Sequence, residues 1–286
     1  MRFTTIACAL VAAATAFAAP VRKNSATSVL NYALTLEHLE SEFYKQGLAK
    51  FDESSFTDAG FDAKVRDRLV HIGEHESDHV STLTSVIKSL KAKPVPVCEY
   101  NFPMDNITQF LAIAQALENT GVSAYLGAAS GLSGDLLTAA AQITTVEARH
   151  ASYLNELWGQ LGAPYSFDTA LSSEQIVTIA TSFIKSCPYD LGVKPFNHLT
   201  ATLPSEDSTK VTTAFTGKGA NSNKTYCQFL YGNKNAVSPR SECTLPADAE
   251  GYVFVIVTDS KTPVTLTSQS NILAGPTLLF SGTHMH

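Results

Sequence analysis

Apolar residues recur in steps of three and four along four long stretches in the first 160 or so residues. This spacing places the apolar side chains on one face of a helix, and such faces pack together in a helix bundle. Proline and glycine follow the ends of the second and fourth stretches, where they would stop a helix. The pattern predicts helices at about 27–50, 62–91, 105–131 and 135–161, and a shorter fifth helix at about 173–186.

The pattern changes beyond residue 204 into short runs rich in β-branched and aromatic residues, separated by Gly, Pro, Asn and Ser. These runs are KVTTAFTG, TYCQFLYG, GYVFVIVTD, PVTLTS and PTLLFSG. Runs of this kind are typical of antiparallel strands joined by turns, and they predict a small β-sandwich. The expected fold class is therefore α+β, with a helical bundle over 26–187, a connector over 188–204 and an all-β domain over 205–286.

Each of the four long predicted helices carries ionisable residues in the middle of its apolar face. The first and third carry a lone glutamate, and the second and fourth carry a Glu-x-x-His pair, which puts a carboxylate and an imidazole side by side. The six residues are Glu37, Glu76, His79, Glu118, Glu147 and His150. Burying four carboxylates without partners would be costly, and two divalent cations would neutralise them. The pattern predicts a carboxylate-bridged site for two transition-metal ions.

The two lone glutamates belong to a repeat, because Glu37 is followed by Tyr44 and Glu118 by Tyr125 in the same pattern, E-x6-Y. Two similar helical hairpins would pack with pseudo-twofold symmetry and bring both tyrosines to the same interior. The candidate catalytic role for Tyr44 and Tyr125 is to donate hydrogen bonds to metal-bound carboxylates, with a redox function as a further option. Ordinary buried tyrosines with satisfied hydroxyl groups are the alternative.

Other ionisable residues near these positions have a different expected role. Glu40 could replace Glu37 as a ligand if the first helix were rotated about its axis. Glu74, His75 and Asp78 fall off the apolar face of the second helix, so they are predicted to lie on its surface.

Four segments carry a resemblance to a known family: NYALTLEHLESEFY, GEHESDHV, ALENTGVSAYLGAA and VEARHASYL. Over about residues 26–186 the chain resembles the secreted fungal ferritin-like proteins called stress-response or late-sexual-development proteins, which are similar to plant desiccation-related proteins. The resemblance implies a ferritin-like four-helix bundle in which the six residues above occupy the metal-ligand positions. It also implies a role in stress or sexual development, and it implies nothing about the β-rich part.

The first 18 residues have a basic start, a short apolar run and small residues at the end, which indicates a secretory signal peptide cleaved after Ala18. No later run is long and apolar enough to cross a bilayer. The mature protein is therefore expected to be exported. The sequons at Asn106 and Asn223 then predict glycosylation.

Four cysteines remain after removal of the signal peptide, and an oxidising compartment favours their pairing. Three pairings are open. Cys98–Cys187 with Cys227–Cys243 is favoured, because it keeps each pair within one of the two predicted parts. The net charge of −6 argues against a nucleic-acid partner.

Three functions are compatible with these features. A pair of iron or manganese ions suits an oxidoreductase acting on O₂ or peroxide, or a metal-binding protein with slow ferroxidase activity. The third is a cell-wall or spore-surface stress protein with a mainly structural bundle. A homodimer is an option for the assembly. The sequence contains neither a G-x-S-x-G elbow nor a dinucleotide-binding fingerprint.

Overall fold

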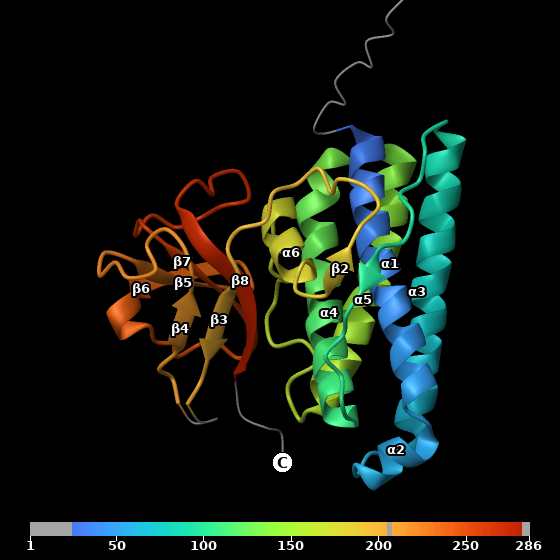
Figure 1. The fold of residues 1–286 in the computed structure, drawn as a ribbon, viewed down its shortest axis with the longest axis horizontal. Helices are drawn as coiled ribbons and strands as arrows, with labels where there is room; N and C mark the ends of the chain where they lie inside the picture. The colour runs from blue at the N-terminus through green and yellow to red at the C-terminus, as the bar shows by residue number, and fades with distance from the viewer. Residues whose placement is uncertain (1–24, 205–207, 282–286) are drawn as a thin grey trace, which may run out of the picture.

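The computed structural model describes residues 25–204 and 208–281. It contains a helical bundle followed by antiparallel sheets, with the sheets packed against one flank of the bundle (Figure 1). The α+β class predicted from the sequence is confirmed. The predicted signal peptide over residues 1–18 lies outside the described residues.

Four long helices form the bundle, close to the predicted ranges: α1 (Ala26–Lys50), α3 (Ala63–Ser89), α4 (Ile107–Ala128) and α5 (Gly134–Leu157). The residue before three of these helices caps it, because its side-chain oxygen accepts a backbone N–H of the first turn. These caps are Ser25, Asp62 and Asn106. Helix α1 packs most extensively on α3 and α4 on α5, so the bundle consists of two helical hairpins.

Two short helical elements lie at the turns of these hairpins and were not predicted. Helix α2 (Glu53–Asp58) stands between α1 and α3, and Asp52 caps it by accepting the backbone N–H of Ser55. The 3₁₀ helix η1 (Ala129–Gly131) follows α4. Phe56 of α2 is fully buried, so this small helix closes the lower end of the bundle core.

The predicted fifth helix is too long. Helix α6 (Ser173–Ala180) ends early, and Ile184–Ser186 form strand β2, which pairs with β1 (Glu99–Tyr100). The Cys98–Cys187 disulfide lies directly beside this pair of strands. Backbone pairing with a segment more than eighty residues earlier ends the helix, and local periodicity carries no signal of such a partner.

The C-terminal part contains two antiparallel sheets. Strands β3 (Leu199–Thr202) and β4 (Thr212–Phe215) form a hairpin. A four-stranded sheet has the order β6-β5-β7-β8, and its strands are β5 (Tyr226–Tyr231), β6 (Lys234–Pro239), β7 (Gly251–Thr258) and β8 (Ile272–Ser281). The short helix η2 (Arg240–Glu242) follows β6. The Cys227–Cys243 disulfide ties β5 to the segment after η2, so both favoured pairings are present.

Three strand predictions were wrong in detail. The run PVTLTS forms no strand and has only an isolated bridge between Thr265 and Ser268. Strand β3 lies inside the predicted connector, and β6 was missed. Each error concerns a segment with few apolar residues, in which pairing with a neighbouring strand decides the conformation.

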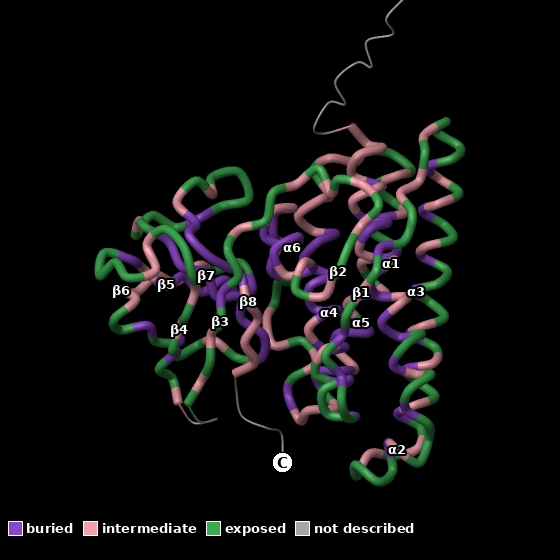
Figure 2. The backbone as a smooth tube through the Cα atoms, in the orientation of Figure 1, coloured by how far each residue is buried: buried purple, intermediate pink, exposed green. Residues whose placement is uncertain are grey.

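Strand β7 is buried along its whole length because both faces of the four-stranded sheet are covered (Figure 2). Val253, Val255 and Val257 face the hairpin of β3 and β4, in a core that includes Leu199. The alternate residues face the bundle and share a core with α4 and α6: Tyr252, Phe254, Ile256, Ala124 and Ile176. This second core joins the sheet to the helical bundle. In the described part of the chain, no helix is long and apolar enough to cross a membrane.

Candidate metal centre

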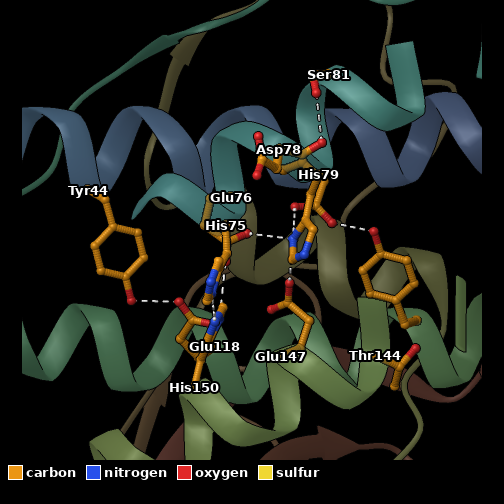
Figure 3. A network of polar contacts seen from close by, with 12 residues as sticks. Tyr44, His75, Glu76, Asp78, His79, Ser81, Glu118, Thr144, Glu147 and His150 are labelled. Atoms are coloured by element: carbon orange, nitrogen blue, oxygen red, sulfur yellow. Dashed lines mark hydrogen bonds and ion pairs between the residues drawn. The ribbon is translucent and has the colours of Figure 1, made fainter. Parts of the chain in front are cut away.

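The six predicted ligand residues converge in the interior of the bundle. The four glutamates are fully buried, and the two histidines are nearly so. They come from all four long helices, with Glu37 on α1, Glu76 and His79 on α3, Glu118 on α4, and Glu147 and His150 on α5. Figure 3 shows His79 directed toward Glu147 of the facing helix and His150 lying beside Glu118.

The six side chains form two overlapping groups. In the first group, Nδ1 of His79 lies 3.2 Å from a carboxylate oxygen of each of Glu37, Glu76 and Glu147. In the second, Nδ1 of His150 lies 3.1 Å from Glu118 Oε2 and 3.2 Å from Glu76 Oε1. Each group offers four ligand atoms that lie within 4.8 Å of one another, and each could hold a metal ion.

Glu76 and Glu147 belong to both groups. Oε1 of Glu76 and both oxygens of Glu147 are buried and accept no hydrogen bond from a described residue. Of these oxygens, Glu76 Oε1 lies 3.2 Å from Nδ1 of His150, and Glu147 Oε1 lies 3.2 Å from Nδ1 of His79. Buried carboxylate oxygens are costly without a donor or a cation. Two carboxylates shared between two groups, with buried oxygens that accept no hydrogen bond, fit the bridging positions of a dinuclear site.

The two tyrosines contact the lone glutamates crosswise. The hydroxyl of Tyr44 donates a 2.6 Å hydrogen bond to Glu118, and the hydroxyl of Tyr125 donates one to Glu37. Both side chains are buried, and burial raises the pKa of each phenol well above its usual value, so both are neutral donors. Each tyrosine thus holds the glutamate of the other half of the repeat.

A fifth carboxylate lies in the same interior. Glu40 of α1 is 4% exposed and faces Gly121 of α4. A Cβ atom on Gly121 would lie 2.8 Å from Glu147 Oε2 and 3.0 Å from Glu40 Oε1, so only glycine leaves room for both oxygens. Glu40 does not replace Glu37, which keeps its contacts with His79 and Tyr125. Glu40 is therefore a further buried carboxylate beside the six predicted ligand residues.

His75 was expected on the surface, and only part of this expectation is correct. Its side chain is exposed, but Nδ1 lies 3.0 Å from Nε2 of His150, and the two rings stack with an interplanar angle of 9°. Burial, followed by repulsion from His150, lowers the pKa of His75, which favours a neutral ring whose Nδ1 can accept a hydrogen bond from the N–H at His150 Nε2. Helical periodicity gave no signal for this contact, because the partner is on another helix.

Glu74 and Asp78 of helix α3 lie on the surface as expected, as does the neighbouring His71. His71, Glu74 and Asp78 are all exposed. His71 and Glu74 lie 3.1 Å apart and form a solvent-exposed pair, which contributes little to stability. They take no part in the buried cluster.

Three of the buried carboxyl groups, those of Glu37, Glu147 and Glu40, have raised pKa values. Burial raises the pKa of Glu37 to about 7, despite the opposing contacts with His79 and Tyr125. Burial and then repulsion from Glu76 raise the pKa of Glu147 well above its usual value. Burial, followed by repulsion from Glu147, has the same effect on the pKa of Glu40. Several of these acids would thus hold protons near neutral pH, and cations would have to displace them.

Glu76 and the histidines shift in the opposite sense, toward their charged forms. Burial acts to raise the pKa of Glu76, but contacts with His150 and His79 outweigh it and lower the pKa to about 2. Burial acts to lower the pKa of His150, but attraction to Glu118 outweighs it and raises the pKa to about 9. The pKa of His79 is raised further by three carboxylates, against the effect of burial. The cluster is a strongly coupled set of opposite charges.

Residues 25–160 match the sequence model of the ferritin-like domain. Over these residues the chain is similar to the ferritin-like domain family. One relative is protein rds1 of Schizosaccharomyces pombe, which is 30% identical over 162 residues. That match covers 56% of this chain and 39% of the relative, so the chain spans about two fifths of the length of the curated relative it matches.

The two matches confirm the resemblance to fungal ferritin-like proteins of the stress-response type. The ferritin-like match ends at residue 160 and thus includes α1 to α5 and all six residues of the cluster. A ferritin-like bundle with glutamate and histidine groups that could bind metal ions is therefore present in this protein. Helix α6 and strands β2 to β8 lie beyond the matched residues.

Proposed function

We propose that the bundle holds two transition-metal ions and that the protein is an oxidoreductase acting on O₂ or peroxide. Glu37 and His79 would bind one ion, Glu118 and His150 the other, and Glu76 and Glu147 would bridge the two. The observation that carries this proposal is that Glu76 and Glu147 belong to both ligand groups. Both iron and manganese accept this donor set.

The bound metals would supply the redox chemistry, and the protein side chains would supply position and charge. The hydroxyl groups of Tyr44 and Tyr125 hold one oxygen each of Glu118 and Glu37. Each of these glutamates therefore has a fixed orientation, with its second oxygen next to a histidine Nδ1. The contact between His150 and His75 would fix the tautomer of His150, leaving Nδ1 free to bind a metal.

The burial of the site supports a small oxidant. None of the six residues lines the cavity of about 580 Å³ between α1, α4 and α6, whose walls include Tyr32, Leu36 and Val177. A large organic substrate would have to displace helix residues to reach the cluster. The same burial favours a second candidate, a bundle stabilised by metal with little or no turnover, as a cell-wall or spore-surface protein would need.

Export of the protein is part of the proposal. The two disulfides and the absence of a spanning helix in residues 25–204 and 208–281 are consistent with secretion. The sequons at Asn106 and Asn223 are both exposed, which suits glycosylation. Stress or developmental function, a homodimer and attachment to the cell wall stay predictions.

Elemental analysis of the purified native protein tests the metal site, and O₂ and peroxide consumption assays test turnover. We expect about two transition-metal ions per chain. Replacing both bridging residues, Glu76→Gln with Glu147→Gln, should remove them, whereas the exposed pair Glu74→Gln with Glu156→Gln should not. Unchanged metal content in the first double variant would refute the site. Two bound ions without consumption of either oxidant would favour the structural candidate.

A further inference from the structure

The two halves of the helical repeat differ at one position inside the site. Glu37 and Tyr44 correspond to Glu118 and Tyr125, and three residues after each lone glutamate the first half has Glu40 where the second has Gly121. The structure places these two corresponding residues against each other across the bundle. Because the glycine has no side chain, the carboxylate of Glu40 occupies the space that a side chain at position 121 would fill.

Glu40 has no structural partner to explain its burial. Among residues 25–204 and 208–281, no hydrogen bond or ion pair joins its carboxylate to another group. Its electrostatic neighbours are four more carboxylates, first Glu147 and then Glu76, Glu118 and Glu37. A fifth acid among four others is unfavourable unless positive charge is placed there.

We propose that Glu40 supplies the fifth negative charge of the metal centre and favours the trivalent over the divalent state of the bound ions. This inference rests on the proposed function. Four ligand carboxylates already balance two divalent ions, so the centre has no need of Glu40 in that state. Reduction of peroxide to two water molecules would require two protons and one electron from each of the two divalent ions, which would become trivalent. The pair then has six positive charges, and a fifth carboxylate offsets part of the excess.

The position of Glu40 suits this role. Oε1 of Glu40 lies 3.0 Å from the point where a Cβ atom of residue 121 would be, and Oε2 of Glu147 lies 2.8 Å from the same point. Glu147 is a proposed bridging residue. A charge at such a short distance in a buried site changes the energies of two oxidation states unequally, because the interaction scales with the charge of the ion. Glu40 would therefore tune the reduction potential, and binding of the divalent ions would not require it.

The test compares Glu40→Gln with Glu42→Gln in the full-length protein reconstituted with iron. Glu42 is on the same helix but pairs with Lys45 at the surface, so its replacement makes the same charge change outside the site. Elemental analysis gives the iron content, and a spectroelectrochemical titration gives the reduction potential. We expect Glu40→Gln to keep two ions and to reduce the preference for the trivalent state about tenfold, a rise of about 59 mV for a one-electron step. Glu42→Gln should keep the native value.

Each other outcome is decisive. A native potential in Glu40→Gln, with two ions bound, would overturn the inference and leave the proposed function intact. Loss of the divalent ions from Glu40→Gln would make Glu40 an ordinary ligand and would also overturn it. Absence of metal from the native protein would overturn the proposed function and the inference together. If Glu40→Gln does not fold, Glu40→Asp takes its place in the test, because the shorter side chain moves the carboxylate away from the site by one methylene. A native potential in Glu40→Asp would refute the role.

Discussion

The hydroxyl group of Tyr44 donates a hydrogen bond of 2.6 Å to Oε1 of Glu118, although 74 residues separate them in the chain. Tyr125 makes the corresponding bond to Glu37 across 88 residues. Each half of the repeat therefore orients the lone glutamate of the other half. The pseudo-twofold relation expected from the two E-x6-Y segments appears here as an exchange of contacts between the two helical hairpins.

Removing these hydroxyl groups should weaken metal binding. Tyr44→Phe and Tyr125→Phe each take away one hydrogen bond to a carboxylate and leave the ring in place, so we expect metal affinity to fall about tenfold for each. Competition with a chelator of known affinity measures the change. Tyr153→Phe on α5 is the matched control, since its hydroxyl does not contact the cluster. Native affinity in both site variants would mean that the tyrosines only fill the core.

His75 should act on the metal centre from the surface. Replacing it with Ala removes the group that contacts Nε2 of His150. Groups that orient a metal-binding histidine typically account for about 10–100-fold in affinity, and we expect a loss in this range. The same chelator competition reports it, with His71→Ala as control because His71 is exposed and pairs with Glu74 at the surface. Equal affinity in the two variants would show that the contact has no effect on the site.

The metal-free protein should lose stability as the pH rises from about 4.5 to about 9. Burial raises the pKa of Glu37 to about 7, so the folded state holds a proton there that the unfolded chain has released. The pKa of His150 is raised to about 9, mainly by Glu118 against burial, so its contribution is present at low pH and is lost as the pH passes that value. Thermal unfolding in the presence of a chelator measures the trend.

Metal should reverse this pH dependence, because cations bind the deprotonated carboxylates and the neutral histidines. We expect the rise in unfolding temperature on adding metal to grow between about pH 5 and about pH 8. Over this range buried carboxyl groups with raised pKa values, such as Glu37, lose the protons that compete with the metal. Burial acts to raise the pKa of Glu76, but contacts with the two histidines lower it to about 2. Glu76 therefore adds stability as the pH rises from about 2 to about 4.5, which is below the range of this trend. Metal-free stability that rises toward pH 8 would contradict the charge distribution described above.

The sheet should be an integral part of the folded protein. Phe254 of β7 is fully buried in the core shared with α4 and α6, and its replacement by Ala should reduce the free energy of unfolding by about 3–5 kcal/mol. Phe167 is 63% exposed, so Phe167→Ala should change the free energy of unfolding little. Chemical denaturation of both variants gives the values. Similar small effects in both would mean that the sheet packs only weakly on the bundle.

Much of the site could be predicted because helical periodicity is a local property. A residue three or four positions after another lies on the same face of a helix, so the six ligand candidates could be assigned to the interior without coordinates. The favoured cysteine pairing followed from the change of pattern near residue 204, and both disulfides are present. The α+β class followed from the same change.

The sequence by itself determined the four long helices, their buried faces, and the two Glu-x-x-His pairs and two lone glutamates that meet inside. Only the tertiary structure decided the exchange of tyrosine contacts, the facing of Glu40 and Gly121, the stacking of His75 on His150, and the end of α6 where β2 pairs with β1. The physical reason is the range of the interactions. A helix face is set by neighbours within one turn, whereas these contacts join residues on different elements whose relative rotation and register depend on how the whole core packs.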